Sequence, residues 1–209
     1  MSLRLYENIS LWLPDDVECV GKYDIPRILP TEMPDFSGWI PFNLCMNRDA
    51  THKAVHMFIE DYQMQRLWNR PTQYVDILRR AACVCSPDFS IYTDSPQALN
   101  IYNHYRKHWL AAWWQQQGLN VIPTICWGDE STFSWCFDGE PRRSVVAVSS
   151  IGTQRHVEDA AAFMKGYDAM LERLKPESIL FYGNIPTGAR GNIIPIETFH
   201  EQMRRRCKR

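Results

Sequence analysis

The sequence lacks the features that would send the chain to a membrane or out of the cell. Its first residues contain no apolar signal core, and no window approaches the ~18 apolar residues of a membrane span. The 23 Lys and Arg residues nearly balance the 24 Asp and Glu residues, so the formal net charge of -1 creates no field that would attract nucleic acid or lipid. We therefore expect a cytoplasmic protein with no membrane partner.

Paired cysteine and zinc motifs are also missing. The 7 cysteines are odd in number and have no framework spacing, which favours free thiols in a reducing compartment. Cys83 and Cys85 share one face of a predicted strand but have no second pair to complete a zinc site. His104 and His108 share a helix face without the H-E-x-x-H pattern, and we interpret them as a packed pair. No metal site is expected, and the sequence identifies no cofactor.

Glycine-based catalytic motifs are absent too. No G-x-G-x-x-G follows a predicted strand, and neither a P-loop lysine nor a G-x-S-x-G elbow occurs. These absences exclude the usual signatures of dinucleotide enzymes, P-loop nucleotide hydrolases and α/β-hydrolases.

The residues that are present predict one α/β domain over residues 1–209, a length that suits a single core. Residues 1–50 are expected to form an irregular arm packed on this domain, because four prolines between Pro26 and Pro41 disfavour regular structure there. Phe36, Trp39 and neighbouring apolar residues would attach the arm. Residues 203–209 form a basic tail.

The organising stretch is residues 81–95. A short buried strand at 81–85 breaks into the turn Ser86-Pro87-Asp88 and leads to a long helix that Ser95 caps and Gly118 ends. Strand, polar turn and helix make the half-unit of a parallel α/β sheet. Further strands are predicted at 54–59, 120–125, 144–148, 178–182 and 193–196, and helices at 62–69, 74–80, 131–137 and 155–174.

Repeated strand–loop–helix units fit two architectures with a mainly parallel sheet. The first is an abbreviated barrel of the TIM type, since a complete eight-stranded barrel needs about 250 residues. The second is an open doubly wound sheet. In both, chemistry is expected beyond the carboxyl ends of the strands.

Polar side chains follow nearly every predicted strand and would therefore share one rim. They are Asp61, Ser86, Asp88, Asp129, Glu130, the pair Ser149 and Ser150, and Asn184, and Asp94 follows in the loop just before Ser95. Clustered carboxylates raise one another's pKa and serve as general acids, bases or nucleophiles. We predict Asp88, Asp129 and Glu130 as catalytic residues, with Asp88 as nucleophile or general base and one of the other two as the acid.

The remaining rim residues, Asp61, Ser86, Asp94, Ser150 and Asn184, are predicted to bind substrate. Trp127 joins them, because its indole can stack on a planar ligand. The competing interpretation is structural: an Asp after a strand often caps the next helix, and a Trp often packs in a core.

Several motifs together resemble a known family. They are SPDFSIY at 86–92, NHYR at 103–106, the run 121–141, and SVVAVSSIGT at 144–153. The resemblance spans residues 54–183 and points to the domain-of-unknown-function family four-four-one-seven, found in bacterial phages, plasmids and integrated elements. Asp88, Trp127, residues 137–139 and Gly152 fall on its recurring positions, whereas the loop 149–153 departs from its usual glycine-threonine pattern. The resemblance implies a mobile-element setting and no specific reaction.

Two functions follow from these features. The first is an enzyme of the hydrolase or glycosyl-transfer type whose acidic rim acts on a nucleotide-like or glycosidic small molecule. The second is a non-catalytic phage-type protein that binds a host factor, through the aromatic arm at 36–42 or the basic tail. The tail, Arg204 to Arg209, is also a weak candidate for binding nucleic acid.

Overall fold

The computed structural model of the chain describes residues 13–14, 16–154, 156–198, 201 and 204. Its elements in chain order are β1 (Cys19–Val20), β2 (Ile25–Pro26), β3 (Trp39–Pro41), α1 (Phe42–Cys45), β4 (Ala54–His56), α2 (Asp61–Asn69), α3 (Pro71–Leu78), β5 (Cys83–Cys85), α4 (Gln97–Gln116), β6 (Val121–Ile122), the 3-10 helix η2 (Glu130–Ser134), β7 (Val145–Ser149), α5 (Val157–Leu174), β8 (Ser178–Tyr182) and β9 (Ile193–Ile196). Every predicted strand and helix from residue 54 to 196 has a counterpart, although several strands are shorter than predicted.

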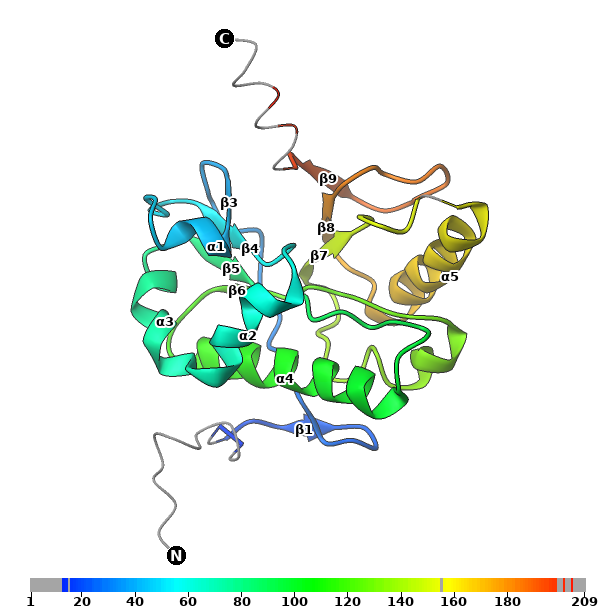
Figure 1. Ribbon diagram of the computed structural model, residues 1–209, viewed down its shortest axis with the longest axis horizontal. Helices are drawn as coiled ribbons and strands as arrows, with labels where there is room; N and C mark the ends of the chain where they lie inside the picture. The colour runs from blue at the N-terminus through cyan, green and yellow to red at the C-terminus, as the bar shows by residue number, and fades with distance from the viewer. Residues whose placement is uncertain (1–12, 15, 155, 199–200, 202–203, 205–209) are drawn as a thin grey trace, which may run out of the picture.

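Two parallel sheets form the centre of the molecule, with helices around them (Figure 1). The first has the order β3-β4-β5-β6 and the second the order β7-β8-β9, and all of their pairings are parallel. Parallel strands covered on both faces need apolar side chains on both, and β7 and β8 are buried along almost their whole length. The predicted α/β class with a mainly parallel sheet is confirmed.

The two sheets are joined where β6 meets β7. Ile125 donates its N–H to the carbonyl of Ala147 at 2.8 Å, and the N–H of Ala147 donates to the carbonyl of Pro123 at 2.8 Å. The resulting bridge between Thr124 and Ala147 is also parallel. The carboxyl ends of the strands of both sheets therefore point the same way. Among the residues that the structure describes, β9 does not pair with β3, and no closed barrel forms.

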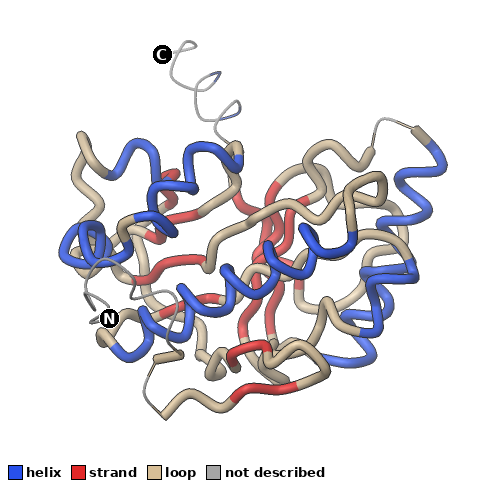
Figure 2. Tube along the Cα trace, turned by 60° about the horizontal axis from the view of Figure 1, so that its bottom comes forward, coloured by secondary structure: helices blue, strands red, loops and turns tan. Residues whose placement is uncertain are grey.

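Helix α4 crosses the whole molecule and lies between the sheets and the small antiparallel pair β1–β2 (Figures 1 and 2). Cover on both sides explains why its second half, with Trp109, Leu110 and Trp114, is buried all round. The spacing of Leu99, Tyr102 and Trp109 at three and four residues predicts one buried apolar stripe along this helix, but Leu99 and Tyr102 are 47% and 44% exposed.

The buried face of α4 in its first half is polar instead. Asn100, Asn103, His104, Lys107 and His108 are all buried there. The predicted cap at Ser95 is also wrong, because the helix begins after Pro96 and has no side-chain cap. Packing against loops, whose backbone groups need hydrogen-bond partners, selects polar residues on this face.

The proline-rich arm is more regular than predicted. Trp39–Pro41 is the outer strand β3 of the first sheet, where a proline at the strand end leaves no ladder bond unmade. Phe36 and Trp39 pack against the buried cluster that includes Ala54 and Tyr182, which attaches the arm to the body of the molecule.

No described helix is long and apolar enough to cross a membrane.

Helix α5 packs against Trp127 at its only glycine. A Cβ built on Gly166 would lie 2.1 Å from the indole of Trp127, so the helix approaches the ring as closely as it does because this residue has no side chain. Trp127 also contacts Phe163 of the same helix, with ring centroids 5.1 Å apart.

Replacing Gly166 by Ala is expected to lower the free energy of unfolding by about 1–3 kcal/mol, because overpacking outweighs the ~1 kcal/mol that Ala gains over Gly in a helix. Urea unfolding of Gly166→Ala, Trp127→Phe and the double variant measures the effect. The smaller ring should relieve the clash, so the double variant should lose less than the sum of the two single changes. Additive losses would contradict this contact.

Candidate functional site

Two adjoining pockets open at the carboxyl ends of the strands. The larger, of about 520 Å³, is lined by residues that include His56, Phe58, Asp61 and Tyr182. The smaller, of about 390 Å³, extends past Trp127 toward α5. Both are lined by Asp88, Ser90, Tyr92, Ser149 and Ile151, so they form one continuous groove whose middle is at Asp88. We call the two pockets together the groove.

Asp88 is held at this position by the chain immediately before it. Ser86 donates its N–H to the carbonyl of Ile122 at 2.8 Å, and its Oγ accepts the N–H of Thr124 at 2.8 Å. The hydroxyl of Thr124 in turn donates to the carbonyl of Ser86 at 2.8 Å. Ser86 is fully buried and lines neither pocket, so its contribution is to fix the turn that presents Asp88.

Asp61 fixes the chain on the other side of Asp88. It begins α2, lines the larger pocket, and accepts hydrogen bonds from the hydroxyl of Ser90 at 2.9 Å and the N–H of Ser90 at 3.1 Å. Asn103 of α4 donates to the carbonyl of Ser90 at 2.7 Å. The loop that carries Asp88 is therefore tied to two helices, α2 and α4.

The pKa of the Asp88 carboxyl group lies near neutrality. Desolvation raises its pKa from 3.8 to about 7, the nearby charge of Asp61 acts in the same direction, and Lys107 partly opposes both. A carboxyl group of this pKa is present in both protonation states at neutral pH, which is the condition for an efficient general acid or base.

Lys107 lies behind Asp88 and is fully buried on α4. Its ammonium group donates to the carboxylate of Glu140 at 2.5 Å and to the carbonyl of Thr124 at 3.1 Å. Burial alone would lower the pKa of Lys107, but Cys126, Glu140 and Asp88 together raise it. The ammonium therefore stays charged close to the groove without lining it.

The floor of the larger pocket is aromatic. The rings of His56 and Phe58 lie 5.7 Å apart, those of Phe58 and Tyr182 4.7 Å, and those of His56 and Tyr182 5.0 Å. Burial lowers the pKa of His56 to about 3, so its imidazole is neutral. Neither ring nitrogen of His56 has a hydrogen-bond partner among the described residues, and both nitrogens are buried.

Sequence reasoning missed His56, Phe58, Tyr182, Lys107 and Glu140. The first two had a usable signal, because Ala54, His56 and Phe58 alternate along one strand and so point to the same face. Lys107 and Glu140 had no such signal, since nothing local predicts that residues 33 positions apart will form a buried ion pair.

Trp127 lines the smaller pocket, and its ring packs on α5. Asp129 and Glu130 line neither pocket. Asp129 caps η2 by accepting the N–H of Ser131 at 3.0 Å, and Glu130 forms an exposed ion pair with Lys165 at 2.7 Å. The acid partner predicted for Asp88 is therefore not in the groove, because the cap on η2 holds Asp129 outside it and the ion pair with Lys165 holds Glu130 on the surface.

Three other predicted binding residues also lie outside the groove. Asp94 is exposed and lines neither pocket. The buried hydroxyl of Ser150 donates to the carbonyl of Asn184 at 2.7 Å, and the side chain of Asn184 is exposed. Ser150 and Asn184 thus join the ends of β7 and β8, and the neighbouring Ser149 is the residue that faces the groove.

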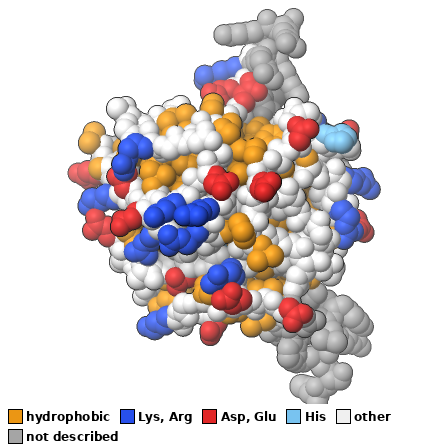
Figure 3. Space-filling view, turned by 180° about the vertical axis from the view of Figure 1, so that it is seen from behind, with side chains coloured by type: hydrophobic (Ala, Val, Ile, Leu, Met, Phe, Trp, Pro, Cys, Tyr) orange, Lys and Arg blue, Asp and Glu red, His pale blue; other side chains and the backbone are white. Residues whose placement is uncertain are grey.

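The groove is acidic where it is charged. Of the described residues that line it, Glu60, Asp61, Asp88 and Asp159 carry carboxyl groups, and none is Lys or Arg. Lys and Arg side chains gather in a patch on the face that is turned away from the viewer in Figure 1 (Figure 3). Cys126 also lines the smaller pocket, but burial raises the pKa of its thiol to about 12, which leaves it neutral and a poor nucleophile.

The sequence matches one protein family and two phage proteins. Residues 17–200 match the model of the family described as Domain of unknown function (DUF4417). The chain is 36% identical over 173 residues to the Gene 1 protein of Mycobacterium phage L5, covering 80% of this chain and 74% of the phage protein. It is 33% identical over 186 residues to the Gene 1 protein of Mycobacterium phage D29, covering 85% of this chain and 65% of that protein.

No solved structure matches the chain. The family match covers nearly all of the described residues, including every residue that lines the groove. With its resemblance to the proteins of two phages, this match shows that the chain belongs to the DUF4417 family of phage-associated proteins.

Proposed function

We propose that the protein is an enzyme of the hydrolase or glycosyl-transfer type that acts on an uncharged glycosidic substrate in the groove, with Asp88 as the proton-transferring group. The observation that carries this proposal is the position of Asp88, whose pKa of about 7 is matched to proton transfer, at the junction of two pockets that no described Lys or Arg lines.

The charge of the groove selects among the substrate classes. A phosphorylated nucleotide would bring negative charge against several carboxylates with no lining cation to balance it. An uncharged sugar or nucleoside has no such penalty. Its ring can stack on the aromatic side chains of Phe58 and Tyr182.

Asp61, and not Asp129 or Glu130, is the second carboxylate that would act with Asp88. It lines the same pocket as Asp88, and its charge helps to keep Asp88 protonated. Two carboxyl groups in one pocket, one of them with a raised pKa, are the arrangement used in glycoside hydrolysis.

The architecture supports a site at this end of an incomplete barrel. A single buried cluster contains side chains from all strands between β4 and β9: Ala54, Cys83, Cys85, Ile122, Val145, Ala147, Leu180, Tyr182 and Ile196. Packing of alternate residues from successive parallel strands on one another is how a barrel interior is filled. The strand order follows the chain order, whereas a doubly wound sheet reverses it at a switch point.

A second candidate function is binding of a host factor without turnover. Tyr92 and Ile151 line the groove and are 57% and 61% exposed. Tyr62, which follows Asp61 in the chain, is 77% exposed. Exposed aromatic side chains favour a protein contact. The basic tail lies almost entirely outside the described residues, so its binding of nucleic acid stays a prediction.

Asp88→Asn is expected to abolish turnover and leave the fold intact. Removing a general acid or base costs about 10²–10⁴-fold in rate. The assay is release of free sugar or base from a panel of uncharged glycosides and nucleosides. Asp94→Asn, in the same loop region but outside the groove, is the matched control and should keep full activity. If Asp88→Asn captures the same host protein as the wild type and no panel member is turned over by either, the binding function replaces this one.

The same substitution should stabilise the protein in a pH-dependent way. The folded state holds a proton on Asp88 up to about pH 7, whereas the unfolded state loses it near 3.8, so wild-type stability falls as the pH rises between these values. Asp88→Asn removes this loss. At pH 8 its free energy of unfolding should exceed that of the wild type by about 2 kcal/mol, a figure that allows for the partial exposure of the carboxyl group. Urea unfolding at pH 4 and pH 8 measures it, and an equal difference at both pH values would contradict a raised pKa.

Ligand binding should discriminate against phosphate. An uncharged nucleoside or sugar is expected to bind at least about tenfold more tightly than its phosphate ester, because the carboxylates repel the added charge. Titration followed by NMR chemical shifts compares each pair at one ionic strength. Tighter binding of the phosphate ester would count against an acidic groove for uncharged substrates.

A further inference from the structure

A second cluster of polar side chains lies on α4 and in the turn that packs against it, outside the lining of the groove. His104 and His108 are one helical turn apart on α4, and Glu140 follows η2 in the chain. All three are buried, and one nitrogen or oxygen atom from each lies within 4.8 Å of the others. None of the three lines the groove.

The hydrogen bonds of the two imidazoles fix their tautomers. Nε2 of His104 lies 3.0 Å from the carbonyl oxygen of Asp138, and Nδ1 of His108 lies 2.8 Å from that of Pro26. A carbonyl oxygen only accepts, so each of these nitrogens carries the ring hydrogen. Nδ1 of His104 and Nε2 of His108 are then left with lone pairs when the rings are neutral.

These lone pairs meet further acceptors and no donor. Nε2 of His108 lies 3.1 Å from Oε1 of Glu140, an oxygen that already accepts from Lys107. Nδ1 of His104 and Oε2 of Glu140 are buried and have no hydrogen-bond partner among the described residues. Converging buried acceptors without a donor are unfavourable unless something positive lies between them.

We propose that His104 Nδ1, His108 Nε2 and the carboxylate of Glu140 bind a transition-metal ion of the zinc class. Two imidazoles and one carboxylate form a common ligand set for zinc, whereas Mg²⁺ and Ca²⁺ prefer sites made of oxygen atoms. The hydrogen bonds from the opposite ring nitrogens to backbone carbonyls are those that orient metal-binding histidines.

The surroundings determine what the ion does. Lys107 occupies one oxygen of Glu140 and balances its charge, which leaves the other oxygen for the ion. Gly139 makes room for the imidazole, since a Cβ there would lie 2.7 Å from Nδ1 of His108. Because the ligands are buried and come from α4 and the turn that follows η2, with Pro26 of β2 fixing His108, the ion serves to hold these segments together and not to contact substrate.

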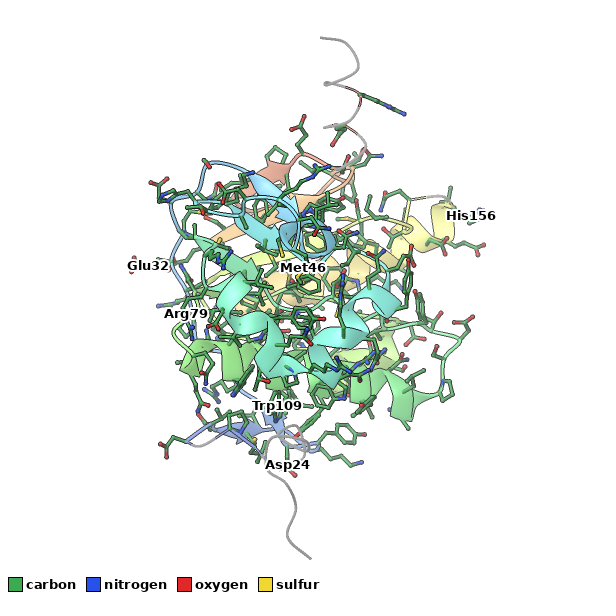
Figure 4. All side chains as sticks on the ribbon, turned by 60° about the vertical axis from the view of Figure 1, so that its left-hand side comes forward. Asp24, Glu32, Met46, Arg79, Trp109 and His156 are labelled. Atoms are coloured by element: carbon green, nitrogen blue, oxygen red, sulfur yellow. The ribbon has the colours of Figure 1, made fainter. Side chains whose placement is uncertain are left out.

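The test is the metal content of protein produced in medium supplemented with Zn²⁺ and then dialysed against a weak chelator. Wild type is expected to retain about one zinc ion per chain, as a structural site does. His104→Gln and Glu140→Gln should retain at least tenfold less. His156→Gln is the matched control and should retain as much as wild type, because His156 projects from the start of α5 into solvent (Figure 4).

Wild type that retains less than a tenth of an ion, or variants that retain as much as wild type, would overturn the proposal and leave a proton or a buried water only. If the variants do not fold, wild type refolded with Co²⁺ decides. Absorption bands of a cobalt ion bound by nitrogen and oxygen in a low-symmetry site support the assignment, and the spectrum of aqueous Co²⁺ overturns it.

Discussion

A single buried charge organises this protein: the ammonium group of Lys107. A lysine with no exposed surface is stable only if its charge is paired, and Glu140 and the carbonyl of Thr124 do this. These partners come from separate loops, one after η2 and one after β6, so the ion pair joins α4 to both. Removing one partner of such a pair typically costs about 3–5 kcal/mol, because the other charge is left without compensation.

The same ammonium group links the core to the groove. Its charge acts against the desolvation of Asp88, and without it the carboxyl group would be still harder to ionise. Ser86 and Thr124 connect the two sites mechanically, since Thr124 both bonds to Ser86 and accepts from Lys107. The position of α4 and the protonation of Asp88 therefore depend on each other.

Much of the fold could be predicted from the sequence, because its signals are local. Runs such as residues 144–148 and 178–182 are apolar on both faces, which is characteristic of parallel strands, and their polar ends mark the rim. The polar face of α4 could not be predicted, since Asn100 and Asn103 are buried only because the loop at 90–92 presents backbone groups to them. Sequence periodicity indicates which apolar side chains are buried, but it does not indicate polar side chains that are buried against the backbone of a loop.

The candidate site was predictable only in part, for a related reason. A carboxylate after a strand is equally suited to capping and to catalysis, and the sequence does not distinguish Asp88 from Asp129. The surroundings do: Asp129 accepts the N–H of Ser131, two residues further on, whereas Asp88 has no such donor among the residues that the structure describes and is desolvated. His56 lies within the apolar run 54–59, so the sequence pattern assigns it to a buried strand and gives no separate sign of a residue that lines a pocket.

The continuity of the groove restricts the position in which a long ligand would bind. Asp88, Ser90 and Tyr92 belong to both pockets, so a chain-like molecule that filled the groove would present an internal linkage to Asp88, and its two ends would lie to either side. A bond cleaved at Asp88 would then be an internal one, in contrast to the stepwise trimming expected of a pocket closed at one end.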